Sequence, residues 1–261
     1  MKSDSVIATI EPKAQKLLRL HDVWFAYTDV VDTVRNLNLD LLPGEFHCLV
    51  GRSGCGKTSL LKLAAGLLLP KRGEVLWNNK PLDGPHNDMG FVFQRPTLLE
   101  WLHVLDNVLL PIALHREIET SDLEKAKDLL QGLGLGNKTH NKPAELSGGQ
   151  QSRVAIARAL ITSPRILFMD EPFAALDAIT REELQHDLME ICAEHKTTIL
   201  FVTHDIGEAV YLGDHVSVMD GGEIHLTLEI NLPEPRRNAI RHSPEFNHYS
   251  ARLRRAMEES A

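Results

Sequence analysis

The chain has 261 residues, of which 43% are apolar and 25% charged, a composition typical of a globular protein with room for one large domain or a core plus a subdomain. Its net charge of −8 argues against general nucleic-acid binding, because proteins that bind a phosphate backbone carry an excess of basic residues. The 3 cysteines are too few for a disulfide framework, no apolar run approaches the ~20 residues that cross a bilayer, and residues 1–12 lack the apolar core of a signal peptide. We therefore expect a cytosolic protein that works at a membrane only when a partner recruits it.

The first hundred residues predict short strands with one helix among them. Residues 1–15 are polar, and we expect a loose tail there. A period-2 run between Val34 and Leu41 is typical of a half-buried strand, and the turn at Pro43-Gly44 leads into an apolar one. A strand-like segment opens with Leu18, Leu20 and Val23 and ends at 26–29, further strands are expected over 46–50, 74–77 and 90–93, and a helix over 59–65.

The pattern changes between about Pro96 and Pro164, where helices without convincing strands are expected. The segment 106–115 is helical in pattern. Ser121 and Glu124 read as a capping box for a helix that runs to Leu133, and 150–161 forms a third helical pattern. We interpret residues 97–163 as a helical subdomain inserted into an α/β core.

Strands and helices alternate again after this block. Strands are expected over 166–169 and 197–202, helices over 178–192 and 206–212, and a hairpin around Gly221-Gly222. This alternation predicts a parallel sheet with helices on both faces. In the last residues, an apolar stripe on a short helix either packs on the chain's own core or contacts a partner or membrane surface; its members are Phe246, Tyr249, Leu253 and Met257.

One segment fits the phosphate-loop pattern G-x-x-x-x-G-K-[ST], and it lies between a predicted strand and a predicted helix. Its glycines let backbone N–H groups point at a phosphate, and the helix N-terminus adds partial positive charge. Lys57 supplies a charge for the β- and γ-phosphates, and the hydroxyl of Thr58 can ligate Mg²⁺. The predicted nucleotide-contacting residues here are Gly51, Arg52, Ser53, Gly54, Cys55, Gly56, Lys57, Thr58 and Ser59.

Polar side chains follow three other apolar strands, at Gln94, at Asp170-Glu171 and at His204. The ends of parallel strands share one edge of a sheet, where ligands of open α/β folds bind. Asp170 suits Mg²⁺ coordination, and Glu171 can sit beside the attacking water as the base. His204 can contact the γ-phosphate, and Gln94 can reach Mg²⁺ and the water. We predict Glu171, His204 and Gln94 as catalytic residues.

A second diagnostic segment, Leu146–Gln150, lies in the helical block. Ser147 is a suitable N-cap for the helix that follows, and Gly148 and Gly149 allow a ligand to approach the backbone. This segment therefore predicts another phosphate-facing helix N-terminus, about 90 residues from the phosphate loop.

Together these motifs resemble the ATP-binding subunit of an ABC transporter, over about Leu18 to Leu228. The phosphate loop matches Walker A, 166–171 matches Walker B, and Leu146–Gln150 matches the signature motif. Gln94, His204 and Asp177 match the Q-loop, the switch histidine and the D-loop. Tyr27 matches the aromatic that stacks on adenine, although an aromatic there could simply cover core. Ala174 and Ser152 depart from the residues common at their positions, and neither change removes a catalytic group.

The resemblance implies an α/β fold, with a P-loop (RecA-like) core of mostly parallel sheet, an antiparallel β subdomain and the inserted helical subdomain. It implies an ATPase domain over 16–230 and a C-terminal tail over 231–261. It also implies a head-to-tail dimer that binds ATP and Mg²⁺, in which the signature segment of one copy, with Ser147, Gly148, Gly149 and Gln150, completes the ATP site of the other. Asp177 is a further implied nucleotide-binding residue.

The implied partners are integral membrane permease subunits and, indirectly, an extracytoplasmic solute-binding protein. The protein would then work at the cytoplasmic face of the inner membrane. The apolar segment 93–102 looks like its counterpart in importers for nitrate, sulfonates and taurine, where it would receive a helix of the membrane subunit. It could instead pack inside the helical subdomain, or do both. The alternative function is a soluble ABC-type ATPase not tied to transport.

Overall fold

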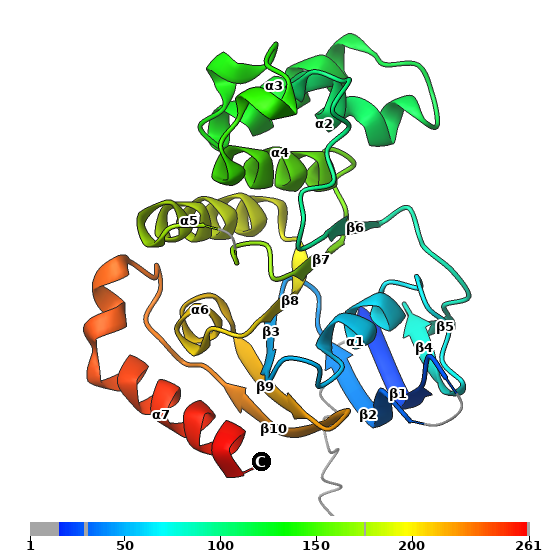
Figure 1. Cartoon of the computed structure of the whole chain (residues 1–261), viewed down its shortest axis with the longest axis vertical. Coiled ribbons are helices and arrows are strands. Elements are labelled where there is room, and N and C mark those ends of the chain that lie inside the picture. Colours follow the sequence, from blue (N-terminus) through cyan, green and yellow to red (C-terminus); the bar gives the residue numbers. More distant parts are fainter. Residues whose placement is uncertain (1–15, 29–30, 175, 260–261) are drawn as a thin grey trace, which may run out of the picture.

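The computed structural model describes residues 16–28, 31–174 and 176–259, so the predicted tail at 1–15 lies outside it. A six-stranded sheet with the order β10-β9-β3-β8-β7-β6 forms the core (Figure 1). β3, β6, β7, β8 and β9 pair in parallel, and β10 pairs antiparallel with β9. The strands are β3 (Phe46–Gly51), β6 (Met89–Val92), β7 (Ile166–Asp170), β8 (Thr198–Thr203), β9 (His215–Asp220) and β10 (Glu223–Glu229). Every residue of β3, β7 and β8 is buried, as expected for a parallel sheet covered on both faces.

A second, four-stranded sheet is antiparallel, with the order β2-β1-β4-β5. Its strands are β1 (Leu18–Phe25), β2 (Val34–Leu41), β4 (Arg72–Trp77) and β5 (Lys80–Pro81). Helix α1 (Lys57–Ala64) shares one apolar core with this sheet and with one face of the six-stranded sheet. The predicted antiparallel subdomain is therefore present, and it holds α1, the helix after the phosphate loop, in place.

Three helices between β6 and β7 form the helical part, which gathers at one end of the molecule in Figure 1. They are α2 (Val104–Ala113), α3 (Thr120–Gly132) and α4 (Gly148–Leu160). The capping box predicted at Ser121 is wrong, because the N-cap of α3 is Glu119, two residues earlier. The backbone N–H of Glu119 donates to the carboxylate of Asp122 at 2.9 Å, and Arg116 holds that carboxylate in place with two hydrogen bonds.

The remaining helices cover the other face of the six-stranded sheet. They are α5 (Ala178–His195), α6 (Ile206–Leu212) and α7 (Pro244–Glu259). The predicted C-terminal helix is present as α7, which has 16 residues. Its stripe packs on the chain's own core, with Phe246 and Leu253 buried and Tyr249 and Met257 partly buried. Across the described residues, no helix combines the length and the apolar character needed to cross a membrane.

Candidate functional site

The phosphate loop joins the end of β3 to the start of α1, as the sequence predicts. Gly56 adopts a left-handed backbone with a φ of 105°. A Cβ at this position would lie 2.5 Å from the carbonyl oxygen of Thr33, so a larger residue would force the backbone to shift. The loop is therefore packed tightly against the segment that precedes β2.

Lys57 lies inside the loop that it follows. Its buried ammonium group donates hydrogen bonds to the carbonyl oxygens of Gly51 at 2.8 Å and Arg52 at 2.9 Å. These contacts hold one positive charge beside a cavity of about 320 Å³. The cavity is lined by Thr33, Ser53, Gly54, Gly56, Lys57, Thr58, Ser59 and Glu171. Its donors and its cation suit a polyphosphate group.

A hydroxyl and a carboxylate meet next to this cavity. Thr58 Oγ1, at the start of α1, donates to Asp170 Oδ1, at the end of β7, over 3.0 Å. Burial raises the pKa of Asp170, and the hydrogen bond from Thr58 opposes that rise. Hard oxygen atoms of this kind are the ligands that Mg²⁺ takes from proteins. The pair thus fits the predicted metal site.

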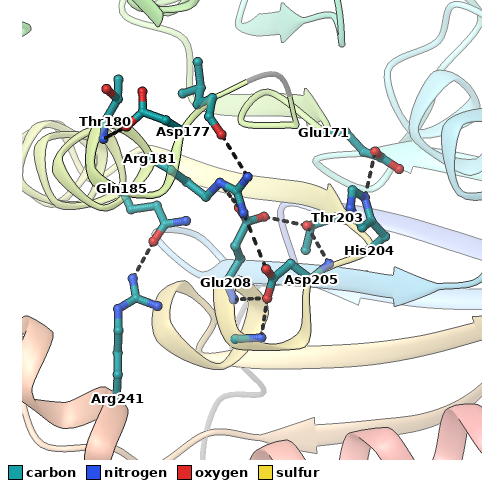
Figure 2. A network of polar contacts seen from close by, with 12 residues as sticks. Glu171, Asp177, Thr180, Arg181, Gln185, Thr203, His204, Asp205, Glu208 and Arg241 are labelled. Carbon is teal, nitrogen blue, oxygen red and sulfur yellow. Dashed lines mark hydrogen bonds and ion pairs between the residues drawn. The ribbon is translucent and has the colours of Figure 1, made fainter.

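Glu171 and His204 form a second pair at the same edge of the sheet. Glu171 Oε2 lies 3.0 Å from His204 Nδ1 (Figure 2). Glu171 has a left-handed backbone with a φ of 44°, and its N–H donates to the carbonyl of Val202 in β8 at 2.9 Å. Non-glycine residues in this region carry strain that tends to occur at functional sites. The arrangement turns the carboxylate of Glu171 toward the cavity that it lines.

A polar network ties this pair to the start of α5 (Figure 2). The guanidinium of Arg181 donates to the carbonyl of Leu176 at 3.0 Å, and it lies 3.6 Å from the carboxylate of Asp205 and 3.5 Å from that of Glu208. Asp205 caps α6 by accepting from the N–H groups of Gly207 and Glu208. The segment before α5 and the loop after β8 are thus linked through one side chain.

The predicted signature segment caps α4. Ser147 Oγ accepts from the N–H of Gln150 at 3.3 Å, and the side chain of Gln150 accepts from the N–H of Ser147 at 3.0 Å. Asp177 caps α5 in the same way, through the N–H of Thr180, and this bond lowers the pKa of Asp177. Among the described residues that line the cavity beside Lys57, none comes from 147–150, and Asp177 is not there either.

A protein-family model described as ABC transporter matches residues 34–174. At 44% identity the chain is also similar to the aliphatic sulfonates import ATP-binding protein SsuB of Pectobacterium atrosepticum, over 78% of this chain and 74% of the relative. The chain belongs to the ABC transporter family.

Two solved structures share the fold. One is a dimeric, post-hydrolysis state of the ATP-binding cassette MJ0796 bound to ADP and Pi, with a TM-score of 0.73 and 31% identity over 83% of this chain and 100% of that one. The other is CbiO1 from Clostridium perfringens, part of the ABC transporter complex CbiONQ, with a TM-score of 0.76 and 28% identity over 94% of this chain and 98% of that one. The chain is the ATP-binding subunit of an ABC transporter, and it is an ATPase.

Two predicted residues of this ABC transporter ATPase lie at the rim of the site. Tyr27 is 60% exposed, which leaves its ring accessible to a ligand, and its stacking on adenine stays a prediction. Its hydroxyl accepts from Ser59 Oγ at 3.2 Å, and its ring meets the edge of Phe25. Gln94 is exposed and lies two residues past Val92, the last residue of β6, so it follows the carboxyl end of the strand that pairs with β7.

Sequence reasoning missed two residues of this ABC transporter site. Thr33 lines the cavity, but it matches no motif and its role appears only when β2 folds against the loop. Arg181 connects Leu176 to Asp205, which lie 29 residues apart in the chain. The available signal was a basic residue four positions after Asp177, the residue that matches the D-loop.

In the segment 93–102, one side chain packs inward and another is exposed, and its role in receiving a helix of a membrane subunit stays a prediction. Leu98 packs against the core, whereas Trp101 is 71% exposed. Beside the segment, a cavity of about 930 Å³ opens between the β6 region and α2, with Phe93, Leu99, Leu110 and Leu114 in its lining. The lining also contains charged residues, among them Arg116, Lys125 and Arg158, and a hollow of this size offers room for a segment of another protein.

Proposed function

We propose that this chain is the ATP-hydrolysing subunit of an importer, and that it drives uptake of a sulfonate, taurine, nitrate or a related small solute through separate membrane subunits. The observation that carries the proposal is the meeting of the phosphate loop, Asp170, Glu171 and His204 at one edge of the sheet. The similarity to SsuB supports import and the solute class.

Nucleotide binding is assigned to residues on β3, α1 and the segment after β1. The N–H groups of the loop and the ammonium of Lys57 bind the β- and γ-phosphates, and Tyr27 stacks on the adenine. Thr58, Asp170 and Gln94 would hold Mg²⁺, which neutralises charge that develops on the phosphate oxygens. The existing contact between Thr58 and Asp170 supports this assignment.

Hydrolysis is assigned to Glu171, with His204 and Gln94 assisting. Glu171 orients a water molecule in line with the γ-phosphate and accepts its proton. His204 contacts the carboxylate of Glu171 through Nδ1, which leaves the other ring nitrogen, Nε2, for the γ-phosphate. The side chain of His204 is 60% exposed, so it can reach a ligand without moving buried groups.

The second half of each ATP site is assigned to a second copy of the chain. Ser147, Gly148, Gly149, Gln150 and Asp177 do not line the cavity of their own subunit, yet Ser147 and Gly148 present a helix N-terminus to the outside. The dimeric state of the similar MJ0796 cassette supports a head-to-tail dimer. ATP would close this dimer, and hydrolysis would open it.

The membrane subunits are assigned to the cavity that Phe93 and Leu99 line. A helix from the permease would enter it and follow the movement of the helical part relative to the core. The membership of the similar CbiO1 in a transporter complex supports such a partner. This docking would place the protein at the cytoplasmic face of the inner membrane, with the solute-binding protein on the other side.

The test is uptake of labelled taurine, alkanesulfonate and nitrate by cells that express this chain with the permease genes found beside it. Glu171→Gln should abolish uptake and steady-state ATP hydrolysis, whereas the permease should still copurify with the variant. Glu190→Gln, at an exposed carboxylate on α5, is the matched control. If the chain copurifies with no integral membrane protein while it hydrolyses ATP normally, a soluble ABC-type ATPase is the correct function.

A further inference from the structure

Three chemically reactive side chains meet at the edge of the sheet opposite the phosphate loop. His47 lies near the start of β3 and pairs in register with His215 at the start of the parallel strand β9. Glu45 directly precedes β3, so its side chain lies on the same face as that of His47. The motifs of the ATPase involve none of these residues.

Their ligating atoms converge on one point. Glu45 Oε1 lies 2.8 Å from His47 Nδ1 and 3.0 Å from His215 Nδ1, and all three atoms lie within 4.8 Å of one another. The two imidazole rings stack with their centroids 5.9 Å apart. Glu45 and His47 are buried, while the His215 side chain is 33% exposed. Solvent therefore reaches the group from the His215 side.

Hydrogen bonds within the group leave one buried nitrogen unsatisfied. His215 Nδ1 is shielded from solvent and has no hydrogen bond of acceptable geometry, although the carboxylate of Glu45 is close. Glu45 is buried as well, and its carboxylate has no lysine or arginine among its described ion-pair partners. A buried carboxylate beside an unpaired imidazole nitrogen favours a cation between them.

A second layer of contacts fixes two of the side chains. Glu45 Oε2 accepts from the N–H of Leu42 at 2.8 Å, which turns Oε1 toward the histidines. His47 Nε2 lies 2.9 Å from Ser217 Oγ, which in turn lies 2.7 Å from Thr227 Oγ1. When Nε2 donates to Ser217, Nδ1 presents its lone pair to the centre of the group. Such outer partners orient the histidine ligands of metal sites.

We propose that Glu45, His47 and His215 bind a Zn²⁺ ion, with water as the fourth ligand on the exposed side. Two imidazoles and a carboxylate are a ligand set that Zn²⁺ uses. Bonds of about 2.0–2.1 Å give a tetrahedron whose ligand atoms are about 3.3 Å apart, so the two distances from Glu45 Oε1, 2.8 and 3.0 Å, need to open by a few tenths of an ångström. The ion would join the start of β3, the strand that leads into the phosphate loop, to the start of β9.

Metal binding to the full chain tests the proposal. The protein is stripped with a chelator, and Zn²⁺, or Co²⁺ as a spectroscopic probe, is titrated in excess Mg²⁺ by calorimetry and absorption. We expect one tight site per chain, a Co²⁺ spectrum typical of tetrahedral coordination, and a Tm raised by about 5 °C or more at a Zn²⁺ concentration about a hundred times Kd.

Variants then locate the ion. His215→Ala, at the most exposed ligand, should weaken Zn²⁺ binding at least about tenfold, and Ser217→Ala should weaken it through His47. His225→Ala is the matched control, because this exposed histidine lies on the neighbouring strand β10 and bonds only the carbonyl of Asp220 among the contacts described. The proposal is overturned if the wild type binds no Zn²⁺ at micromolar concentrations, or if His215→Ala and His225→Ala bind it equally well.

Discussion

Gly148 and Gly149 are adjacent at the start of α4, but the structure predicts opposite consequences for adding one methyl group to each. A Cβ at Gly148 would meet no atom of the chain within 4 Å. A Cβ at Gly149 would lie 2.9 Å from Thr180 Cγ2 and 3.5 Å from Leu176 Cδ2. The first glycine is therefore free within its own subunit, and the second is required by packing against α5.

Gly148→Ala should leave the isolated chain as stable as the wild type, or more stable by up to about 1 kcal/mol, because alanine is the better helix residue. If a second copy brings its ATP phosphates against this helix N-terminus, the added methyl group occupies their space. The phosphate would then lose its contact with the N–H groups of this helix N-terminus, and loss of one such preorganised donor lowers turnover by about 100-fold to 1,000-fold. We expect at least that loss in steady-state ATP hydrolysis and no ATP-driven dimer.

Gly149→Ala provides the contrast. Overpacking against Thr180 should lower the stability of the chain by about 1–3 kcal/mol, visible as a lower Tm before any nucleotide is added. Thermal unfolding, size-exclusion chromatography with ATP in a Glu171→Gln background, and phosphate release separate the two effects. Wild-type hydrolysis and dimerisation in Gly148→Ala would refute the assignment of Leu146–Gln150 to a shared site.

Other changes test separate parts of the site. Lys57→Ala removes the charge held beside the cavity and should weaken ATP binding more than tenfold, as measured with a fluorescent nucleotide; unchanged affinity would contradict its assigned contact with the phosphates. Arg181→Met should lower kcat with little effect on the KM for ATP, because it frees the segment at Leu176 from the loop at Asp205; a loss of stability alone, with kcat intact, would assign Arg181 a purely structural role. Arg116 lowers the pKa of Asp122 from 3.8 to about 2, so the ion pair stabilises the fold above pH 3.8 and is lost as the pH falls toward 2. Asp122→Asn should therefore lower the urea midpoint at pH 7, with the difference shrinking below pH 4, and an equal difference at pH 7 and pH 3 would exclude the pair as its cause.

The sequence predicts the existence of nearly all elements because their signals are local. The apolar strands, the glycines of the phosphate loop and the N-cap Ser147 each act within a few residues. The predicted bounds of α6 match those observed. The predicted start of α3 is wrong because Arg116, a residue outside the four-residue capping pattern, binds the carboxylate of Asp122 with two hydrogen bonds. These bonds hold the carboxylate where it accepts from the N–H of Glu119.

The candidate site likewise contains residues that the sequence predicts and residues that it does not. Lys57, Thr58, Asp170, Glu171 and His204 could be named in advance, because each follows a strand whose position in a parallel sheet determines where its end lies. Thr33, Arg181 and the group at Glu45 could not. Their neighbours are defined by which strands and helices come together, and no spacing along the chain encodes those pairings.

The left-handed backbone of Glu171 also bears on how this enzyme would respond to selection for stability. A side chain at a φ of 44° carries about 1–2 kcal/mol that glycine would not. Glu171→Gly would relax that strain while removing the proposed base, so a screen that rewards heat resistance alone would favour a loss of activity at this position. Glutamate at this position is thus a place where the fold gives up stability in favour of turnover, and stabilised variants of the enzyme should be sought at positions away from the end of β7.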